Sequence, residues 1–325
     1  MIVLTHDDVA ALLPMIEAIE VVAGVMKGVS TRTAELPLRS VVPVGGDNRM
    51  GVMPGAIADP ACFGVKLISL FPGNPARGLS SHRGAIVLFE AETGGAVAMM
   101  DASLLTAIRT AAASAVATRA LARENAESLA LIGYGEQAEH HLTAIMAVRP
   151  IKRVAVAGRS AEKAAGFAAR AAADFPDVSF TSGTDLQAAV EQADITCTVT
   201  AAPTPIVMGD WVQPGAHVNV VGSSIPSMRE VDDRMVTRAA IWVDYLPSTL
   251  AQAGEIVEMI AAGNLAESDL RGEIGALLSG EIAGRASDDQ ITLYRSLGVA
   301  AQDLAAAHHV LTRARAEGRG QPVTF

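Results

Sequence analysis

The segment Ser128–Leu142, SLALIGYGEQAEHHL, joins a short apolar run to a helical pattern through two glycines. Gly133, Gly135 and Ala138 follow the spacing G-x-G-x-x-A, which is typical of the turn that holds a dinucleotide pyrophosphate. The first glycine permits a tight turn, the second lets the backbone approach the phosphates, and a small third residue lets helix and strand pack closely. Alone, the pattern is weak evidence, because such turns also occur without a ligand.

Alternating strand and helix patterns follow this turn. Strands are predicted at residues 129–132, 153–157, 178–181, 195–200, 217–221 and 240–243. Helices are predicted between them at 137–148, 161–175 and 185–192. This alternation predicts an α/β fold with a doubly wound parallel sheet of the Rossmann type, whose ligands bind beyond the carboxyl ends of the strands. The succession therefore strengthens the prediction of a dinucleotide site at Gly133.

The second predicted strand ends in Gly158-Arg159-Ser160. A free ribose 2′-hydroxyl usually meets an Asp or Glu about 20 residues past the glycines, whereas a 2′-phosphate needs a cation and hydroxyl donors. This segment contains no acid, which favours NADP(H) while leaving NAD(H) open. The alternative is that Arg159 is only a surface charge at a helix start.

The residues before the Rossmann pattern predict a mostly antiparallel α+β unit. Strands are expected at 2–4, 36–42, 51–55, 63–71, 85–90 and 96–100, and an alanine-rich helix at 103–123. Lys66 lies in a nearly continuous apolar strand, although lysine almost never lies unpaired in a core. Arg109 lies among alanines and is either a surface arginine or a cation held for a carboxylate.

Composition excludes several classes of protein. The 325 residues are 50% hydrophobic with a formal charge of −10, and no basic stripe is present, which argues against a nucleic-acid partner. Cys62 and Cys197 are too few and too far apart for a disulfide framework or zinc cluster, and no other metal pattern appears. No apolar run has the length of a membrane span and MIVLTHDD lacks a signal-peptide pattern, so we expect a cytoplasmic protein without a membrane partner.

Further motifs occur in a definite order along the chain. They are Gly51-Val-Met-Pro54, Ser81-His-Arg-Gly-Ala-Ile-Val-Leu-Phe-Glu90, Met100-Asp101, Thr106-Ala-Ile-Arg-Thr110, Ala193-Asp-Ile195, Val218-Asn-Val-Val-Gly222, Arg229-Glu-Val-Asp232 and Ser296-Leu-Gly298. With the Lys66 strand and the IGYG turn, this series resembles the ornithine cyclodeaminase/μ-crystallin family nearly end to end. The resemblance implies a Rossmann domain over 117–305 and a dimerisation and substrate-binding domain over 1–116 plus 306–325.

The resemblance also implies roles for individual residues and a homodimer. Arg39 and Arg109 look like the pair that grips a substrate α-carboxylate, and Lys66 like the residue that bonds the carboxylate or the reacting nitrogen and relays a proton. Small-molecule substrate would lie between the two domains, against the nicotinamide. The expected cofactor contacts are Thr110 and Thr200, and the expected pocket walls are Met53 and Phe71.

One position departs from the cyclodeaminase pattern. Cyclodeaminases of this family carry an aspartate two residues after the glycine of the VG motif, and here that position is Ser224. Serine cannot be an anionic base, so the chain is more similar to the ketimine reductases of the μ-crystallin type. We predict NADPH-dependent reduction of an α-imino acid, such as pyrroline-2-carboxylate or piperideine-2-carboxylate, to an L-amino acid, with Lys66 and a water on Ser224 keeping the nitrogen protonated.

Three alternatives remain. Two are enzymes: ornithine cyclodeaminase, and an amino acid dehydrogenase similar to alanine dehydrogenase. The third is a ligand-binding protein that keeps the fold and the cofactor but does no chemistry, as μ-crystallin-type relatives suggest. The presence of Lys66, Arg39 and Arg109 favours an enzyme.

Overall fold

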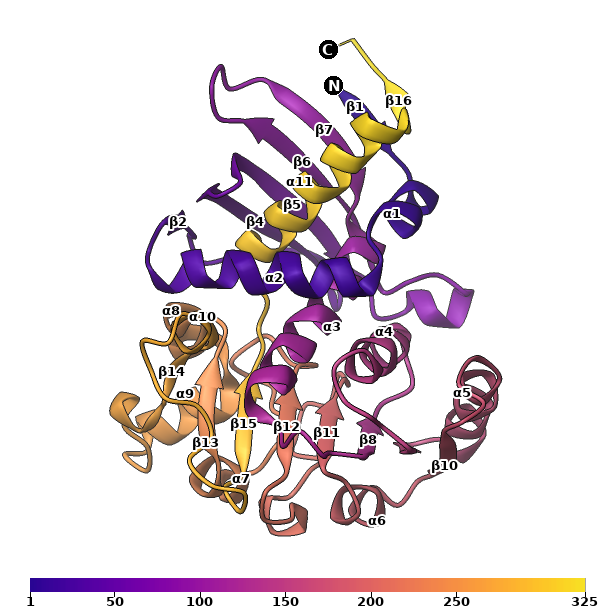
Figure 1. Cartoon of the computed structure of the whole chain (residues 1–325), viewed down its shortest axis with the longest axis vertical. Helices are drawn as coiled ribbons and strands as arrows, with labels where there is room; N and C mark the ends of the chain where they lie inside the picture. The colour runs from indigo at the N-terminus through magenta and orange to yellow at the C-terminus, as the bar shows by residue number, and fades with distance from the viewer. Residues whose placement is uncertain (325) are drawn as a thin grey trace. The chain divides into compact units, whose positions relative to one another are not determined.

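The computed structural model describes residues 1–324, which form two compact units (Figure 1). The first contains residues 1–112 and the segment from Gly298 onward, and the second contains Ala113–Leu297. The family resemblance implies changes of domain at 116/117 and 305/306. Helix α3 (Ala102–Leu121) continues through the first change without a break, so no turn signal marks it in the sequence.

The first unit is built on a mixed sheet of order β16-β1-β7-β6-β5-β4-β2, with β3 paired to β4. Its pairs are antiparallel except for β1 with β7, as the predicted α+β character requires. The strands are β1 (Ile2–Leu4), β2 (Ala34–Glu35), β3 (Ser40–Gly45), β4 (Asn48–Ala58), β5 (Ala61–Leu70), β6 (His82–Glu90), β7 (Ala96–Asp101) and β16 (Gln321–Pro322).

Three helices accompany this sheet: α1 (His6–Leu12), α2 (Met15–Ser30) and α11 (Ala300–Glu317), with a short 3₁₀ helix at Asn74–Arg77. Thr5 caps α1 through a reciprocal box with Asp8, as a Thr followed three residues later by an acid predicts. Figure 1 shows α2 and α11 lying across one face of the sheet, where α11 contacts β4, β5 and β6. Buried side chains of both helices therefore form the core of this unit against that face.

The second unit is a parallel sheet of order β10-β9-β8-β11-β12-β15-β13-β14, so the predicted Rossmann-type fold is confirmed. The strands are β8 (Ser128–Ile132), β9 (Arg153–Ala157), β10 (Ser179–Gly183), β11 (Ile195–Thr198), β12 (His217–Val220), β13 (Ala240–Val243), β14 (Gly272–Glu273) and β15 (Thr292–Arg295). The strand order reverses between β8 and β11, the position where such sheets bind ligands. Strands β14 and β15 were not predicted, and β15 inserts between β12 and β13.

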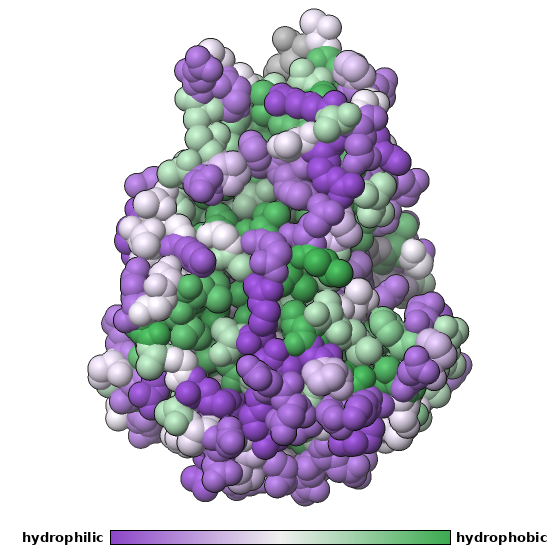
Figure 2. All heavy atoms as spheres, viewed as in Figure 1, coloured by the Kyte–Doolittle hydropathy of each residue, from purple (hydrophilic) through white to green (hydrophobic). Residues whose placement is uncertain are grey.

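Helices cover both faces of this sheet. They are α4 (Glu136–Met146), α5 (Ala161–Asp174), α6 (Leu186–Glu191), α7 (Asp233–Arg238), α8 (Leu246–Gln252), α9 (Gly254–Ala261) and α10 (Ile274–Leu278), with 3₁₀ helices at Gly209–Trp211 and Glu267–Asp269. Figure 2 shows hydrophilic side chains over the surface near α6 and α7. Within residues 1–324 no single helix is long and apolar enough to cross a membrane; α1 and α2 reach that length only together, across a bend of 82°.

Candidate active site

Lys66 is buried on β5, on the sheet face that α2 and α11 cover. Its neighbours across the sheet are Met53 on β4 and Ile86 on β6, both buried. Only 2% of the lysine is exposed. Since a buried ammonium is costly without a partner, the neighbours that compensate its charge define this site.

Asp303, in the first turn of α11, is the counter-ion of this lysine. Lys66 Nζ donates to Asp303 Oδ1 at 2.8 Å and lies 2.7 Å from Oδ2. Arg109 Nε donates to the same Oδ1 at 2.8 Å, and Arg109 Nη1 donates to Gln302 Oε1 at 3.0 Å. The sequence reasoning missed Asp303 and Gln302, although a polar pair within the apolar run of α11 directly after Ser296-Leu-Gly298 was an available signal.

Arg39 belongs to the same cluster. Its Nη2 donates to the Gly298 carbonyl at 2.7 Å, and its charge acts on Lys66. The predicted residues Lys66, Arg39 and Arg109 are thus brought together in one unit. Lys66 and Arg109 share the Asp303 carboxylate, and Arg109 Nη2 has no acceptor among residues 1–324. The Arg109 Nη2 group, which has no acceptor among the described residues, suits an added carboxylate.

The electrostatics of the cluster set the proton affinity of the lysine. Burial, reinforced by the Arg109 and Arg39 charges and opposed by Asp303, lowers the pKa of Lys66 to about 7. Burial by itself would raise the pKa of Asp303, but the Arg109 and Lys66 charges outweigh it and hold that pKa below its usual value. At neutral pH Asp303 is therefore ionised, while Lys66 can gain or lose a proton.

Two other predicted residues of this unit lie outside the ion-pair cluster. Phe71 is half-buried one residue after β5, and its N–H donates to the Ser81 carbonyl at 2.9 Å. Thr110 follows Arg109 on α3, and its hydroxyl donates to the Thr106 carbonyl at 2.6 Å. Because this bond uses the proton of the hydroxyl, a ligand could only donate to Thr110.

The glycine turn of the second unit has the geometry of a phosphate site. Gly133 has φ +120°, and a Cβ there would lie 2.8 Å from the Val199 carbonyl oxygen. Gly135 is the N-cap of α4 with no side-chain cap, and nothing lies within 4 Å of an added Cβ. Ala138 is fully buried in the core between helix and sheet. Open backbone at a helix N-terminus fits the pyrophosphate of a dinucleotide.

The predicted Gly158-Arg159-Ser160 segment follows β9 at the same edge of the sheet. Arg159 is exposed and has no ion-pair or hydrogen-bond partner among residues 1–324. Ser160 is the N-cap of α5, and its hydroxyl oxygen accepts from the Lys163 N–H at 3.3 Å. A cation and a hydroxyl are therefore available where a ribose 2′-substituent binds in such folds.

A buried carboxylate, Glu230, connects the ends of β11 and β12. It accepts from Thr198 Oγ1 at 2.9 Å, from both the N–H and Oγ1 of Thr200 at 2.8 Å, and from the Gly222 N–H at 2.6 Å. The Thr200 hydroxyl therefore donates its proton to Glu230. Ser224, two residues beyond Gly222, is half-buried with no hydrogen-bond partner in the described chain. The sequence reasoning quoted Glu230 within a motif but gave it no role.

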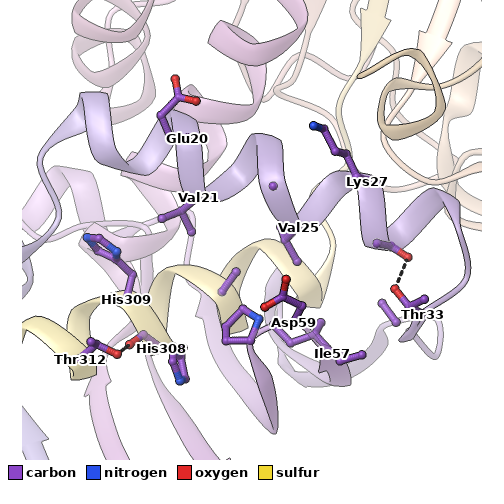
Figure 3. Close-up of a pocket in the computed structure, with 16 residues that line it drawn as sticks. Glu20, Val21, Val25, Lys27, Thr33, Ile57, Asp59, His308, His309 and Thr312 are labelled. Atoms are coloured by element: carbon purple, nitrogen blue, oxygen red, sulfur yellow. Dashed lines mark hydrogen bonds between the residues drawn. The ribbon is translucent and has the colours of Figure 1, made fainter. Parts of the chain in front are cut away.

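A surface hollow of about 680 Å³ lies elsewhere in the first unit, between α2 and α11 (Figure 3). Its charged or titratable side chains are Glu20, Lys27, Asp59, His308 and His309. Lys66, Arg39 and Arg109 are not among its lining residues. Within residues 1–324 no three His, Cys, Asp or Glu side chains converge as metal ligands.

Comparison with known proteins identifies the family. Residues 1–318 match the model of the ornithine cyclodeaminase/mu-crystallin family. A Delta(1)-pyrroline-2-carboxylate reductase of Bacillus cereus is 35% identical over 329 residues, covering 100% of both chains. The structure of a Thermococcus litoralis Delta(1)-pyrroline-2-carboxylate reductase in complex with NADH and L-proline is 31% identical, with a TM-score of 0.96 over 99% of this chain and 100% of that one.

An archaeal alanine dehydrogenase dimer with bound NAD is similar as well. It is 30% identical, with a TM-score of 0.93 over 100% of this chain and 99% of that chain. The family model and the full-length relatives agree with the ordered motifs and the fold of each unit. The chain therefore belongs to the ornithine cyclodeaminase/mu-crystallin family.

Proposed function

We propose that this protein is a nicotinamide-dependent reductase that converts a cyclic α-imino acid, such as Δ1-pyrroline-2-carboxylate, to the L-amino acid. The observation that carries the proposal is the cluster of buried Lys66, Arg109 and Asp303 with half-buried Arg39, in which the lysine has a pKa of about 7. The names of two similar proteins, from Bacillus cereus and Thermococcus litoralis, support the choice of substrate.

The arginines bind and orient the carboxylate of the substrate. Arg109 is held by Asp303 and Gln302 through Nε and Nη1, which leaves Nη2 for an added anion. Arg39 is held by the Gly298 carbonyl. A guanidinium fixed by its own acceptors loses little freedom when it binds, so the imine carbon is oriented at low entropic cost.

Lys66 supplies the proton of the reaction. Reduction of a C=N bond adds a hydride to carbon and a proton to nitrogen, and a protonated nitrogen makes the carbon electrophilic. The bound nicotinamide supplies the hydride. A lysine with a pKa of about 7 can donate a proton near neutral pH more readily than an ordinary lysine, whose pKa lies near 10.4. Ser224, with a bound water, would assist by hydrogen bonding to the ring nitrogen.

NADPH is the proposed preferred reductant, with NADH as a weaker one. Arg159 is exposed and without a partner in the described chain, and the Ser160 hydroxyl keeps its own proton for donation. The two similar structures hold NADH and NAD, so the preference rests on these side chains alone. Arg159→Ala should lower kcat/KM for NADPH more than for NADH, whereas Arg170→Ala, an exposed arginine on α5, should change neither.

A homodimer is proposed through the uncovered face of the first unit's sheet. Alternation along β5 places Phe63 and Leu67 on the face opposite Lys66, and both are exposed. Phe63 stacks on Phe89 of β6 with ring centroids 5.2 Å apart, and Met99 of β7 is also exposed. An apolar face of this kind fits a second copy of the chain, and the similar alanine dehydrogenase is described as a dimer.

The decisive assay measures oxidation of NADPH and NADH with Δ1-pyrroline-2-carboxylate and Δ1-piperideine-2-carboxylate. Turnover with L-proline formation is expected. The likeness to alanine dehydrogenase makes oxidation of L-alanine the second candidate, tested in the same assay with pyruvate, ammonia and NADH. Proline formed from ornithine without added reductant would instead show a cyclodeaminase. If none of these reactions occurs although dinucleotide binds, the protein is a binding protein and the proposal fails.

A further inference from the structure

Tyr134, the residue between the two glycines of the phosphate turn, contacts the segment that follows β9. Its phenol oxygen accepts a hydrogen bond from the Ser160 N–H at 3.0 Å. Its ring lies against Gly158, where an added Cβ would be 2.4 Å from Cε1 and 3.0 Å from Cδ1. Because the ring occupies the space that a side chain at position 158 would need, only glycine fits there without moving Tyr134.

The hydrogen-bond roles leave the proton of the phenol free. A phenol that accepts from Ser160 still carries its own O–H, and no acceptor for it lies among residues 1–324. The Ser160 hydroxyl is in the same situation, because it accepts from the Lys163 N–H. Two hydroxyl donors and the Arg159 guanidinium thus belong to one short segment and the tyrosine that packs on it. This donor set matches a phosphate ester, which only accepts hydrogen bonds.

We propose that Tyr134 is a specificity-determining residue for the cofactor, fixing Gly158-Arg159-Ser160 in place and donating its phenolic proton to the ribose 2′-phosphate. The inference rests on the proposed NADPH preference and adds a contact from the phosphate turn itself. A tyrosine that only packed on Gly158 would be replaced by phenylalanine without loss. The hydroxyl therefore separates the specificity role from packing.

The test is direct binding of NADPH and NADH, measured by dinucleotide fluorescence or calorimetry without substrate. In Tyr134→Phe the Kd for NADPH should rise about tenfold, the size expected for losing a hydrogen bond to a charged group, while that for NADH should change less than about twofold. Tyr245→Phe removes the same hydroxyl from a half-buried tyrosine at the N-cap of α8 and should leave the ratio of the two Kd values unchanged. Unchanged melting temperatures would show that both variants are folded.

The outcomes distinguish this inference from the proposed function. If the wild type binds neither dinucleotide, the proposed function fails and this inference with it. If the wild type prefers NADPH and Tyr134→Phe keeps the same ratio of Kd values, the cofactor proposal stands and the role of Tyr134 is refuted. Equal weakening of both dinucleotides would also refute it, because that result indicates a general effect on the turn.

A second pair of variants tests the contact with Gly158. Gly158→Ala must displace the ring, given the 2.4 Å approach, and should weaken NADPH binding at least as much as Tyr134→Phe. Tyr134→Ala should weaken it as well, and adding Gly158→Ala to Tyr134→Ala should cause little further loss, because the ring is already absent. Losses that simply add would show that the two positions act independently and would contradict the proposed fixing of the segment.

Discussion

Replacing Asp303 by asparagine tests whether this carboxylate stabilises the fold and sets the pKa of Lys66. The carboxylate lies 2.7 and 2.8 Å from Lys66 Nζ and 2.8 Å from Arg109 Nε, and the exposed fractions of Asp303, Lys66 and Arg109 are 1%, 2% and 4%. Breaking a buried ion pair costs about 3–5 kcal/mol of stability. Because asparagine keeps one acceptor oxygen, we expect Asp303→Asn to lower the free energy of unfolding by about 3 kcal/mol.

The same substitution should change the proton affinity of the lysine. Asp303 raises the pKa of Lys66 against burial and the arginine charges, so its loss should lower that pKa further below about 7. Above the pKa, each unit of this fall reduces the protonated fraction about tenfold. Asp303→Asn also weakens the bond that positions Arg109, which costs about 1–2 kcal/mol. Together with the smaller protonated fraction of Lys66, this loss should lower kcat/KM at pH 7.5 by about 10²-fold.

The assay is the pH profile of kcat/KM for imine reduction, measured beside thermal unfolding. In Asp303→Asn the alkaline decline should begin at lower pH than in the wild type. Asp177→Asn makes the same chemical change at an exposed position of the second unit and should alter neither measurement. An Asp303→Asn enzyme that keeps both the rate and the position of the alkaline decline would refute the reasoning, because Lys66 would then be independent of the carboxylate.

Three further substitutions and one pH titration of stability have distinct expected outcomes. In the wild type, kcat/KM for reduction should fall as pH rises through about 7, where Lys66 loses its proton; Lys66→Arg should abolish this decline in the pH profile. Between about pH 7 and pH 10 the lowered pKa leaves Lys66 protonated in the unfolded chain but neutral in the folded chain. Denaturant titrations should therefore show that the contribution of Lys66 to the free energy of unfolding increases as pH rises through this range. Arg109→Met should raise KM for the imino acid by about 10²-fold, because it removes a charged contact worth about 2–3 kcal/mol. An unchanged KM in steady-state assays would show that Arg109 does not bind the substrate carboxylate. Leu67→Asp places a charge on the exposed sheet face and should yield monomers in sedimentation velocity, whereas persistence of a dimer would exclude this face as the interface.

The local signals of the sequence were sufficient for most of the fold. The glycine turn at Gly133 and the alternation after it predicted the Rossmann-type sheet, because both are properties of short segments. Strand β15 (Thr292–Arg295) was missed because its four residues follow a long irregular stretch and it pairs with β12 and β13, which lie far earlier in the chain. Pairing between distant segments leaves little trace in a local pattern.

In the ion-pair cluster too, the local sequence predicts one residue but not its distant partner. Lys66 stood out because a lysine in an apolar strand needs a partner, but the pattern does not say which residue that is. The partner, Asp303, is 237 positions away, and its helix reaches Lys66 only when α11 packs on the sheet. A charge that is anomalous in its local setting can thus be recognised from sequence, whereas its counter-ion is identified by tertiary packing.

The state of Asp303 bears on which chemistry the cluster can perform. The resemblance to the cyclodeaminases implies a proton-accepting aspartate at the position that Ser224 occupies in this chain. Asp303 is poorly suited to this task, because the Arg109 and Lys66 charges lower its pKa and both side chains donate hydrogen bonds to its Oδ1. Lys66, in contrast, has a pKa near neutrality and can donate. A cluster whose carboxylate is held as an ion pair and whose amine exchanges protons favours imine reduction over ring closure.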